Sequence, residues 1–117
     1  MGVDNCGILF LGRKEEEVDF SAVADFDIDE WENDIDYLSR WSAQHGYGDW
    51  SDGLIAQADN GMDARFWLIG FRLATSGSYG CVEIMFNELA EKIKRRAGRF
   101  EEIFGISAKL YIMNYLS

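Results

Sequence analysis

The acidic side chains between residues 25 and 36 are the densest set of potential ligands and proton acceptors in the chain. This stretch reads DFDIDEWENDID, and seven of its twelve residues are Asp or Glu. Carboxylates at this density could bind a cation, catalyse hydrolysis as a pair, or form an acidic binding surface. Each of these chemistries makes a different demand on the spacing of the residues.

The spacing argues against a calcium loop. Acids at Asp25, Asp27 and Asp29 resemble the start of an EF-hand loop, which then needs glycine at its sixth position and glutamate at its twelfth. Those two positions hold Glu30 and Asp36. Asp27 is also a good helix N-cap, and Glu30 stands where a capping-box partner belongs. We therefore predict no metal site and no cofactor.

The sequence offers no recognisable catalytic group. His45 is the single histidine, and although Ser42 lies three residues before it, no serine has a Gly-x-Ser-x-Gly setting. No glycine-rich phosphate loop follows a predicted strand. Paired carboxylates would have to face each other across a cleft, which the sequence does not show, and a solvated acidic face is the simpler interpretation. We predict that the chain is not an enzyme.

The charge is large and unevenly placed. The net charge is −10, which disfavours direct contact with nucleic acid or with an anionic membrane and favours a basic partner. Residues 1–63 carry 16 acids and 3 bases, whereas residues 64–117 carry 5 acids and 8 bases. Residues 15–36 alone hold 11 acids and no base. Such asymmetry indicates a charged interaction surface.

Length and cysteine content indicate one cytoplasmic domain over residues 1–117. A chain of 117 residues can bury a core without disulfides or metals. Cys6 and Cys81 are too few for a disulfide framework and lack the spacing of a zinc site, so we expect both to be reduced core residues. No apolar run is long enough for a membrane span, and no secretory signal pattern is visible.

The first half of the chain predicts a buried strand followed by one long helix. The run CGILFLG at 6–12 is typical of a central strand covered on both faces. A helix is predicted over 28–45, ending at Gly46. Its inward stripe consists of Ile28, Trp31, Ile35 and Leu38. Residues 46–63 are expected to form a long loop with a short strand at 54–57.

The second half predicts two strands, a helix and a last strand. Residues 64–74 and 79–86 are expected to form a hairpin around the turn sequence TSGS. A helix is predicted over 88–104, capped by Asn87 and ended by Gly105. The segment AKLYIMNYLS at 108–117 is expected to be the final strand.

The predicted order β-α-β-β-α-β indicates an α+β fold. It resembles the ferredoxin-like βαββαβ sandwich, in which two helices cover one face of a four-stranded antiparallel sheet. That resemblance implies that the first and third strands are antiparallel neighbours. It implies no function, because folds of this kind host many activities.

The second predicted helix cannot neutralise the acids of residues 15–36. It carries five bases and four acids, a balance of +1. Two of the bases are expected to be paired locally, as Glu88–Lys92 and Glu91–Arg95. The dipole of the first helix favours acids only within about its first turn. An acidic surface should therefore persist in the folded protein.

We predict that this acidic surface binds a partner protein. The expected contact residues combine acids with two aromatic anchors: Glu15, Glu16, Glu17, Asp29, Glu32, Asp36, Tyr37 and Trp41. A basic, nucleic-acid-binding surface of another protein would be complementary. In size and charge the chain resembles phage-encoded inhibitors of host defence proteins, some of which act as nucleic-acid mimics, and this resemblance implies an anti-defence inhibitor.

The alternative prediction is a homo-oligomeric domain that binds a small ligand or has a regulatory role. The strand at 64–74 carries apolar residues on both faces, with Trp67, Ile69 and Phe71 alternating with Phe66 and Leu68. A second apolar face needs a cover, which the 46–63 loop, a ligand or a homodimer partner could provide.

Overall fold

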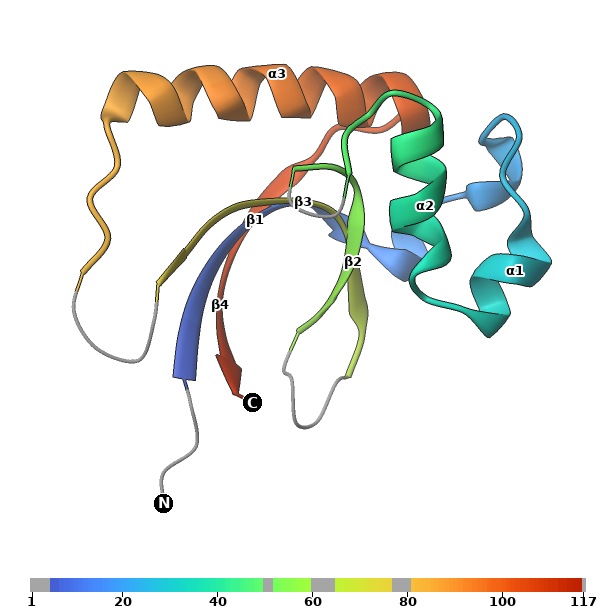
Figure 1. Cartoon of the computed structure of the whole chain (residues 1–117), viewed down its shortest axis with the longest axis horizontal. Coiled ribbons are helices and arrows are strands. Elements are labelled where there is room, and N and C mark those ends of the chain that lie inside the picture. The colour runs from blue at the N-terminus through green and yellow to red at the C-terminus, as the bar shows by residue number, and fades with distance from the viewer. Residues whose placement is uncertain (1–4, 50–51, 60–64, 77–80, 117) are drawn as a thin grey trace.

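A four-stranded antiparallel sheet with helices packed against it forms the protein (Figure 1). The computed structural model describes residues 5–49, 52–59, 65–76 and 81–116. The strands are β1 (Asn5–Lys14), β2 (Ile55–Ala58), β3 (Trp67–Ser76) and β4 (Lys109–Leu116). The helices are η1 (Glu15–Glu17), η2 (Phe20–Ala22), α1 (Ile28–Asn33), α2 (Tyr37–Gln44) and α3 (Phe86–Phe104). The α+β class is therefore confirmed.

β1 is an inner strand, as its continuous apolar run predicts. The strand order is β2-β3-β1-β4, and β1 pairs antiparallel with both β3 and β4. Its first residue, Asn5, faces Leu116 near the end of the chain. Phe10 and Leu11 are almost fully buried, because β1 has a strand on each side and both faces of the sheet are covered by other parts of the chain.

The predicted strand at 79–86 is wrong. Residues 79 and 80 lie outside the described residues, residues 81–85 are irregular, and Phe86 begins α3. The partner of β3 is instead β2, close to the short strand expected at 54–57. β1 pairs along one edge of β3, and β2 pairs with Trp67–Gly70 on the other edge, where the sequence predicted the strand at 79–86.

A buried carboxylate joins the end of β2 to the residues just before β3. Asp59 has only 9% of its surface exposed, and it accepts hydrogen bonds from the backbone N–H of Arg65 (2.7 Å) and from Arg65 Nε (3.0 Å). Burial acts to raise the pKa of Asp59, but these bonds and one from the Phe66 backbone outweigh it and lower the pKa.

The sheet is strongly bent, and two local features explain the bend (Figure 1). The register between β1 and β3 shifts between Leu9 and Phe10, which is a β-bulge. Gly12 and Gly70 face each other across the same two strands, and a Cβ at either would collide with a carbonyl oxygen of the facing strand. The two backbones therefore approach more closely than larger residues would allow.

Both faces of the sheet carry a buried apolar cluster. On the helix side, Ile69 and Phe71 pack in a core with Phe100 of α3. On the other side, a smaller core contains Phe10 and Leu68. These two residues have 0% and 2% of their surface exposed within the single chain. The second face therefore does not need a partner to cover its central residues.

The expected single helix over 28–45 is interrupted. α1 ends at Asn33 and α2 begins at Tyr37, with Asp34 in an extended conformation between them. The Asp34 side chain accepts a hydrogen bond from the backbone N–H of Asp36 (3.0 Å), and the Asp34 carbonyl accepts from Tyr37 N–H (3.0 Å). Local bonds of this kind compete with helical ones and explain the break.

The break changes which predicted stripe residues point inward. Trp31 and Leu38 are buried, as expected, but Ile28 and Ile35 are each 36% exposed. Asp27 caps α1 as predicted, accepting a hydrogen bond from Glu30 N–H (3.2 Å). The Asp27 N–H itself donates to the Tyr37 hydroxyl (2.9 Å), which takes the place of the expected capping-box glutamate.

α3 begins two residues before its expected start. Its N-cap is Met85, which makes no side-chain capping bond, whereas Asn87 was the predicted cap. Its end at Gly105 is confirmed, because that residue adopts a left-handed conformation with φ of 73°. The helix packs on the sheet through its second half, where Arg96, Phe100 and Phe104 are buried.

The prediction of a core position for Cys81 is wrong. Its thiol is free and exposed. The side chain of Cys6 and the ring of Trp50 lie outside what the structure describes. None of the helices in the described ranges combines the length and the apolar character that crossing a bilayer requires.

Candidate functional site

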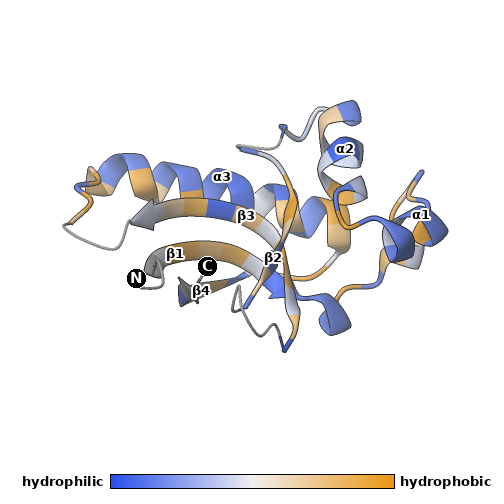
Figure 2. Cartoon of the chain, turned by 60° about the horizontal axis from the view of Figure 1, so that its bottom comes forward, coloured by the Kyte–Doolittle hydropathy of each residue, from blue (hydrophilic) through white to orange (hydrophobic). Residues whose placement is uncertain are grey.

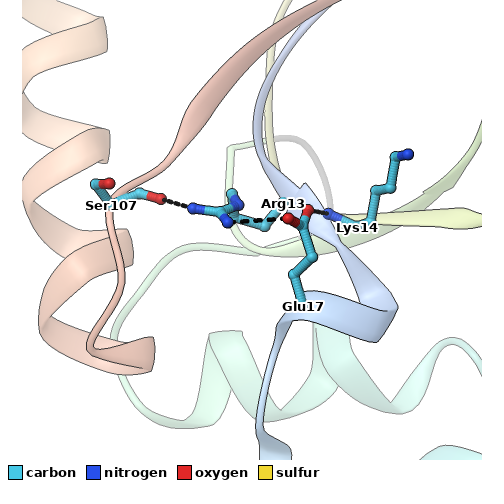
Figure 3. Close-up of polar contacts among 4 residues, drawn as sticks. All are labelled: Arg13, Lys14, Glu17 and Ser107. Atoms are coloured by element: carbon cyan, nitrogen blue, oxygen red, sulfur yellow. Dashed lines mark hydrogen bonds and ion pairs between the residues drawn. The ribbon is translucent and has the colours of Figure 1, made fainter.

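An arginine anchors the acidic turn that follows β1. Arg13 donates one hydrogen bond to the Ser107 carbonyl (2.9 Å) and forms an ion pair with Glu17 (2.9 Å), as Figure 3 shows. Glu17 also accepts from the backbone N–H of Lys14 (3.2 Å). The hydrogen bond from Arg13, strongest among several causes, lowers the pKa of Glu17. Glu17 therefore holds the turn in place as well as contributing charge.

A tryptophan joins this turn to α1. Trp31 is 8% exposed, and its indole Nε1–H donates to the carboxylate of Glu15 (3.0 Å). This bond spans sixteen residues of sequence. It brings η1 beside α1, so the acids of the two elements belong to one region of the surface.

Four of the predicted contact acids are exposed and unpaired. Glu16, Asp29, Glu32 and Asp36 all lie at the surface. Within the described part of the chain, none of them has a basic group within 4.0 Å. Figure 2 shows α1 mostly in the hydrophilic colour, in contrast to β1. These four side chains are free to meet a partner.

The two predicted aromatic anchors are placed differently from the expectation. Trp41 is 3% exposed, and its Nε1–H donates to the Asp25 carbonyl (3.1 Å), so its ring belongs to the core. Tyr37 is half-buried, because its ring packs on Phe26 and its hydroxyl is bonded to Asp27. The prediction that Trp41 is an exposed anchor is wrong.

An aromatic cluster lies beneath the acidic residues. The Phe26 ring is at its centre, with ring centroids 4.5 Å from Phe20, 5.0 Å from Tyr37 and 5.7 Å from Trp41. Aromatic pairs at such distances add to the stability that their burial provides. The short helices η2, α1 and α2 are therefore fixed by this cluster, since they are too short to be stable alone.

Residues of α1, of α2 and of the segment between them line a shallow acidic depression. It has a volume of about 340 Å³ and is lined by Asp29, Glu30, Asn33, Asp34 and Arg40. Arg40 pairs with Asp34 (2.8 Å), and the hydrogen bond between them lowers the pKa of Asp34. Arg40 is the sole base among the described lining residues, which therefore keep a negative balance.

The bases of α3 are not used as the sequence suggests. The expected ion pairs Glu88–Lys92 and Glu91–Arg95 are not formed in the described residues. Lys92, Arg95, Arg96 and Arg99 instead lie along one side of the helix, which we call the basic stripe. The three arginines follow Lys92 after three, four and seven residues, a spacing in the sequence that places all four bases on one side of a helix.

His45 follows the last turn of α2. Its Nδ1 lies 2.9 Å from the Trp41 carbonyl, and its ring stacks on Trp41 with a centroid distance of 4.4 Å. Asp25 lies 3.9 Å from Nε2. These contacts place His45 against the end of the helix, where an imidazole interacts favourably with the dipole.

The described residues contain no group of three or more His, Cys, Asp or Glu side chains arranged to hold a metal ion. Comparison of the chain with known protein families, with characterised proteins and with solved structures gives no match. The two charged regions, residues 15–36 and the basic stripe, are the features of the molecule that point to a function.

Proposed function

We propose that the chain is a protein-binding module that docks its acidic segment, residues 15–36, on a basic surface of another protein. One observation carries this proposal. The segment holds 11 acids, and in the described structure arginines pair with only two of them, Glu17 and Asp34. Concentrated like charge destabilises a folded chain, so an unneutralised surface of this size favours a role in binding.

The acidic field would act first by steering. A basic partner is attracted over a distance of about one Debye length, which raises the association rate and makes it depend on salt. Short-range contacts then hold the complex. Because Trp41 is buried, we assign the apolar contacts to Ile28 and Ile35, which are each 36% exposed and stand between acids in the sequence.

A nucleic-acid-binding groove is the proposed target surface. Such grooves present rows of Lys and Arg that normally meet phosphates, and a row of carboxylates offers them comparable charge. In size and charge the chain resembles phage inhibitors of host defence proteins that use this form of mimicry. We therefore propose that docking excludes nucleic acid from the partner, through binding and without catalysis.

Affinity capture with charge variants tests this proposal. The bait carries Asp29→Asn, Glu32→Gln and Asp36→Asn, and the control bait carries Glu88→Gln, Glu91→Gln and Glu101→Gln on α3. Both sets neutralise three exposed acids. We expect basic proteins to be retained by wild type and control but lost from the first variant, and to be released between about 50 and 300 mM salt.

A second readout connects capture to mimicry. Each retained protein is tested for nucleic-acid binding with and without the wild-type chain, and we expect the chain to reduce that binding. Equal retention by the two variant baits would contradict the acidic docking surface. Retained proteins that keep full nucleic-acid binding would contradict the mimicry.

We also propose that the architecture is a variant of the ferredoxin-like sandwich. The strand order β2-β3-β1-β4 and the placement of α3 between β3 and β4 support this relation. The first crossover differs from the simple pattern, since η1, η2, α1 and α2 replace one helix. That crossover contains the whole acidic segment.

The second candidate function is a homodimeric regulatory domain, and the exposed edge of the sheet favours it. β4 is an edge strand, and Ile112 on it is 87% exposed. Val82 and Ile84 line an apolar groove of about 260 Å³ together with Ile112. Antiparallel pairing of β4 with β4 of a second copy would continue the sheet and cover this groove.

Sedimentation of wild type and Ile112→Lys at about 100 µM tests the dimer. A wild-type dimer that the substitution converts to monomer is the expected result, with Lys94→Ala as a control that leaves the dimer unchanged. A wild-type chain that sediments as a monomer at this concentration would rule this candidate out.

A further inference from the structure

The basic stripe on α3 stands out in a chain of net charge −10. Lys92, Arg95, Arg96 and Arg99 share one side of the helix. In the described part of the chain, none of them lies within 4.0 Å of a carboxylate oxygen. Acids are abundant in this protein, so the lack of such pairs leaves these bases available for another anion.

Arg96 is the most constrained member of the stripe. It is 9% exposed, donates from Nη1 to the Arg72 carbonyl (2.9 Å) and lies over the Phe71 ring, 5.7 Å from its centroid. Burial is the main cause that lowers the pKa of Arg96; the charge of Asp52 opposes this effect, but Arg95 and Arg99 lower the pKa further, and the net shift is downward. A buried guanidinium among like charges is costly unless a negative group offsets it.

A cavity of about 240 Å³ opens above Arg96. Its walls are Gly46, Tyr47, Gly48, Asp52 and Phe71, together with Arg95, Arg96 and Arg99. Arg99 reaches the loop and donates to the Gly46 carbonyl (3.4 Å). The cavity therefore lies between α3 and the start of the loop after α2, and three guanidinium groups line one side of it.

The loop wall of the cavity is fixed by a buried serine. Ser42 is fully buried; its hydroxyl donates to the Gly48 carbonyl (2.8 Å) and accepts from Leu54 N–H (3.0 Å). Gly48 has a φ of 103°, and a Cβ there would lie 2.9 Å from the Gly53 Cα. These contacts hold Gly48 beside Leu54, so the described part of the cavity wall is preformed, which favours ligand affinity.

Among the described residues, Asp52 is the one acid that lines the cavity. Its Oδ1 accepts from the backbone N–H of Asp49 (3.1 Å), so it is held by its own loop. It makes no ion pair with the stripe in the described residues. Three arginines against one aspartate leave a positive balance in the lining.

We propose that this cavity binds the phosphate group of a small molecule. Arginine forks match the oxygens of a phosphate in bidentate fashion, and a phosphate monoester carries about −1.5 to −2 charges at neutral pH, which suits the positive balance of the lining. The size of the cavity and the repulsion from the acidic segment favour a small ligand over a nucleic-acid strand. This inference is independent of the docking function, because no residue of the acidic segment lines the cavity.

Calorimetric titration of the full chain at constant ionic strength tests the site. The probes are inorganic phosphate, adenosine monophosphate and, as a control without the charged group, adenosine. We expect saturable binding of the first two and none of adenosine. Tighter binding of the nucleotide would identify a phosphate monoester as the ligand, and equal or weaker binding would identify free phosphate.

Substitutions on the same helix make the test specific. Arg95→Gln and Arg99→Gln should each weaken phosphate binding about tenfold, the loss expected for one charge-assisted hydrogen bond. Lys94→Gln removes an exposed charge outside the lining and should leave binding unchanged. Asp52→Asn keeps the acceptor for Asp49 but removes the competing charge, and should strengthen binding about threefold.

Two results would overturn the proposal. The first is the lack of saturable binding of either phosphate probe to the wild-type chain. The second is a loss of affinity in Lys94→Gln that equals the loss in Arg99→Gln, because that would show a general charge effect. Circular dichroism of each variant verifies that the fold is retained.

Discussion

The acidic segment and the basic stripe are both built from closely spaced charges, yet the protein holds them in different ways. Acids such as Glu16, Asp29 and Glu32 stand on the surface, and their short helices are fixed by an aromatic core beneath them. Arg96 and Arg99 instead face a preformed cavity. Exposed charges spread over a surface suit recognition of a large basic partner, whereas charges clustered around a cavity suit a small anion.

The two regions do not neutralise each other, although their total charges would allow partial compensation. In the described residues, no ion pair joins α3 to residues 15–36. Figure 1 shows the reason in the arrangement of the elements: α3 extends across the sheet, while α1 lies beyond the sheet at one end of the molecule. Separation keeps each region available for its own partner.

The largest expected effect is a loss of stability on removing a core side chain that supports the acidic segment. Trp41→Ala removes a ring that is 3% exposed and contacts Phe26 and Tyr47. We expect a loss of about 3–5 kcal/mol in the free energy of unfolding, because a large buried aromatic leaves a cavity. Urea denaturation measures it, and a loss below about 1 kcal/mol would mean that Trp41 is not a core residue.

The next largest effect is expected on removing the buried hydroxyl that holds the loop wall of the cavity beside Arg96. Ser42→Ala removes the hydroxyl that joins Gly48 and Leu54, and leaves the Leu54 N–H without its bond. We expect a loss of about 1–3 kcal/mol in stability and, at temperatures where the variant is folded, weaker phosphate binding. Ser39→Ala is the matched control, since its hydroxyl makes one longer bond to the Leu54 carbonyl (3.3 Å). Equal effects of the two substitutions would contradict the special role of Ser42.

A third prediction contrasts the exposed acids with the buried one. Asp59→Asn should cost about 1–2 kcal/mol at pH 7, since it weakens charge-assisted bonds from Arg65. The folded-state pKa of Asp59 is lowered, so its contribution is present above its unfolded pKa of about 3.9 and is lost as pH falls through the folded value. The difference between variant and wild type should therefore shrink in acid. A difference that grows as pH falls would contradict this assignment.

The smallest effect compares the same chemical change in the two regions. Glu16→Gln with Glu32→Gln should raise the melting temperature by about 2 °C, because it relieves repulsion within the acidic segment. Glu88→Gln with Glu91→Gln should lower it by a similar amount, because these acids lie near the bases and the N-terminus of α3. Calorimetry of both double variants measures the two changes in melting temperature. Changes of the same sign would contradict the expected difference between the acidic segment and α3.

The sequence predicted the charge distribution well because charge depends on composition, which folding does not change. It also predicted the α+β class, the inner position of β1, the cap at Asp27 and the helix end at Gly105. These features follow from short apolar runs and from single residues with strong local preferences. The exposure of the acidic side chains could also be predicted from the sequence, since Asp and Glu are rarely buried.

Features that depend on competition between distant segments were not predictable. Residues 79–86 and 55–58 are both apolar enough for a strand, and only the pairing of β3 decides between them. The break at Asp34 has a different, local cause, a side-chain bond to the Asp36 N–H that competes with the helix. Trp41 was expected outside, but the aromatic cluster around Phe26 draws it in.

The basic stripe is hard to recognise in the sequence, because the local pairs Glu88–Lys92 and Glu91–Arg95 offer a simpler explanation for two of its bases. A wheel of α3 that considered the bases alone would place Lys92, Arg95, Arg96 and Arg99 on one side. The cavity itself could not be predicted, since its other wall comes from the loop held by Ser42.

The most direct test of the central claim is an amide NMR titration of the wild-type chain with two oppositely charged probes, an octalysine peptide and inorganic phosphate. We expect octalysine to shift the amides of Glu16, Asp29, Glu32 and Asp36, and phosphate to shift those of Gly46, Gly48 and residues 95–99. Overlapping sets of shifted amides, or octalysine shifts spread evenly over the chain, would contradict two separate charged sites.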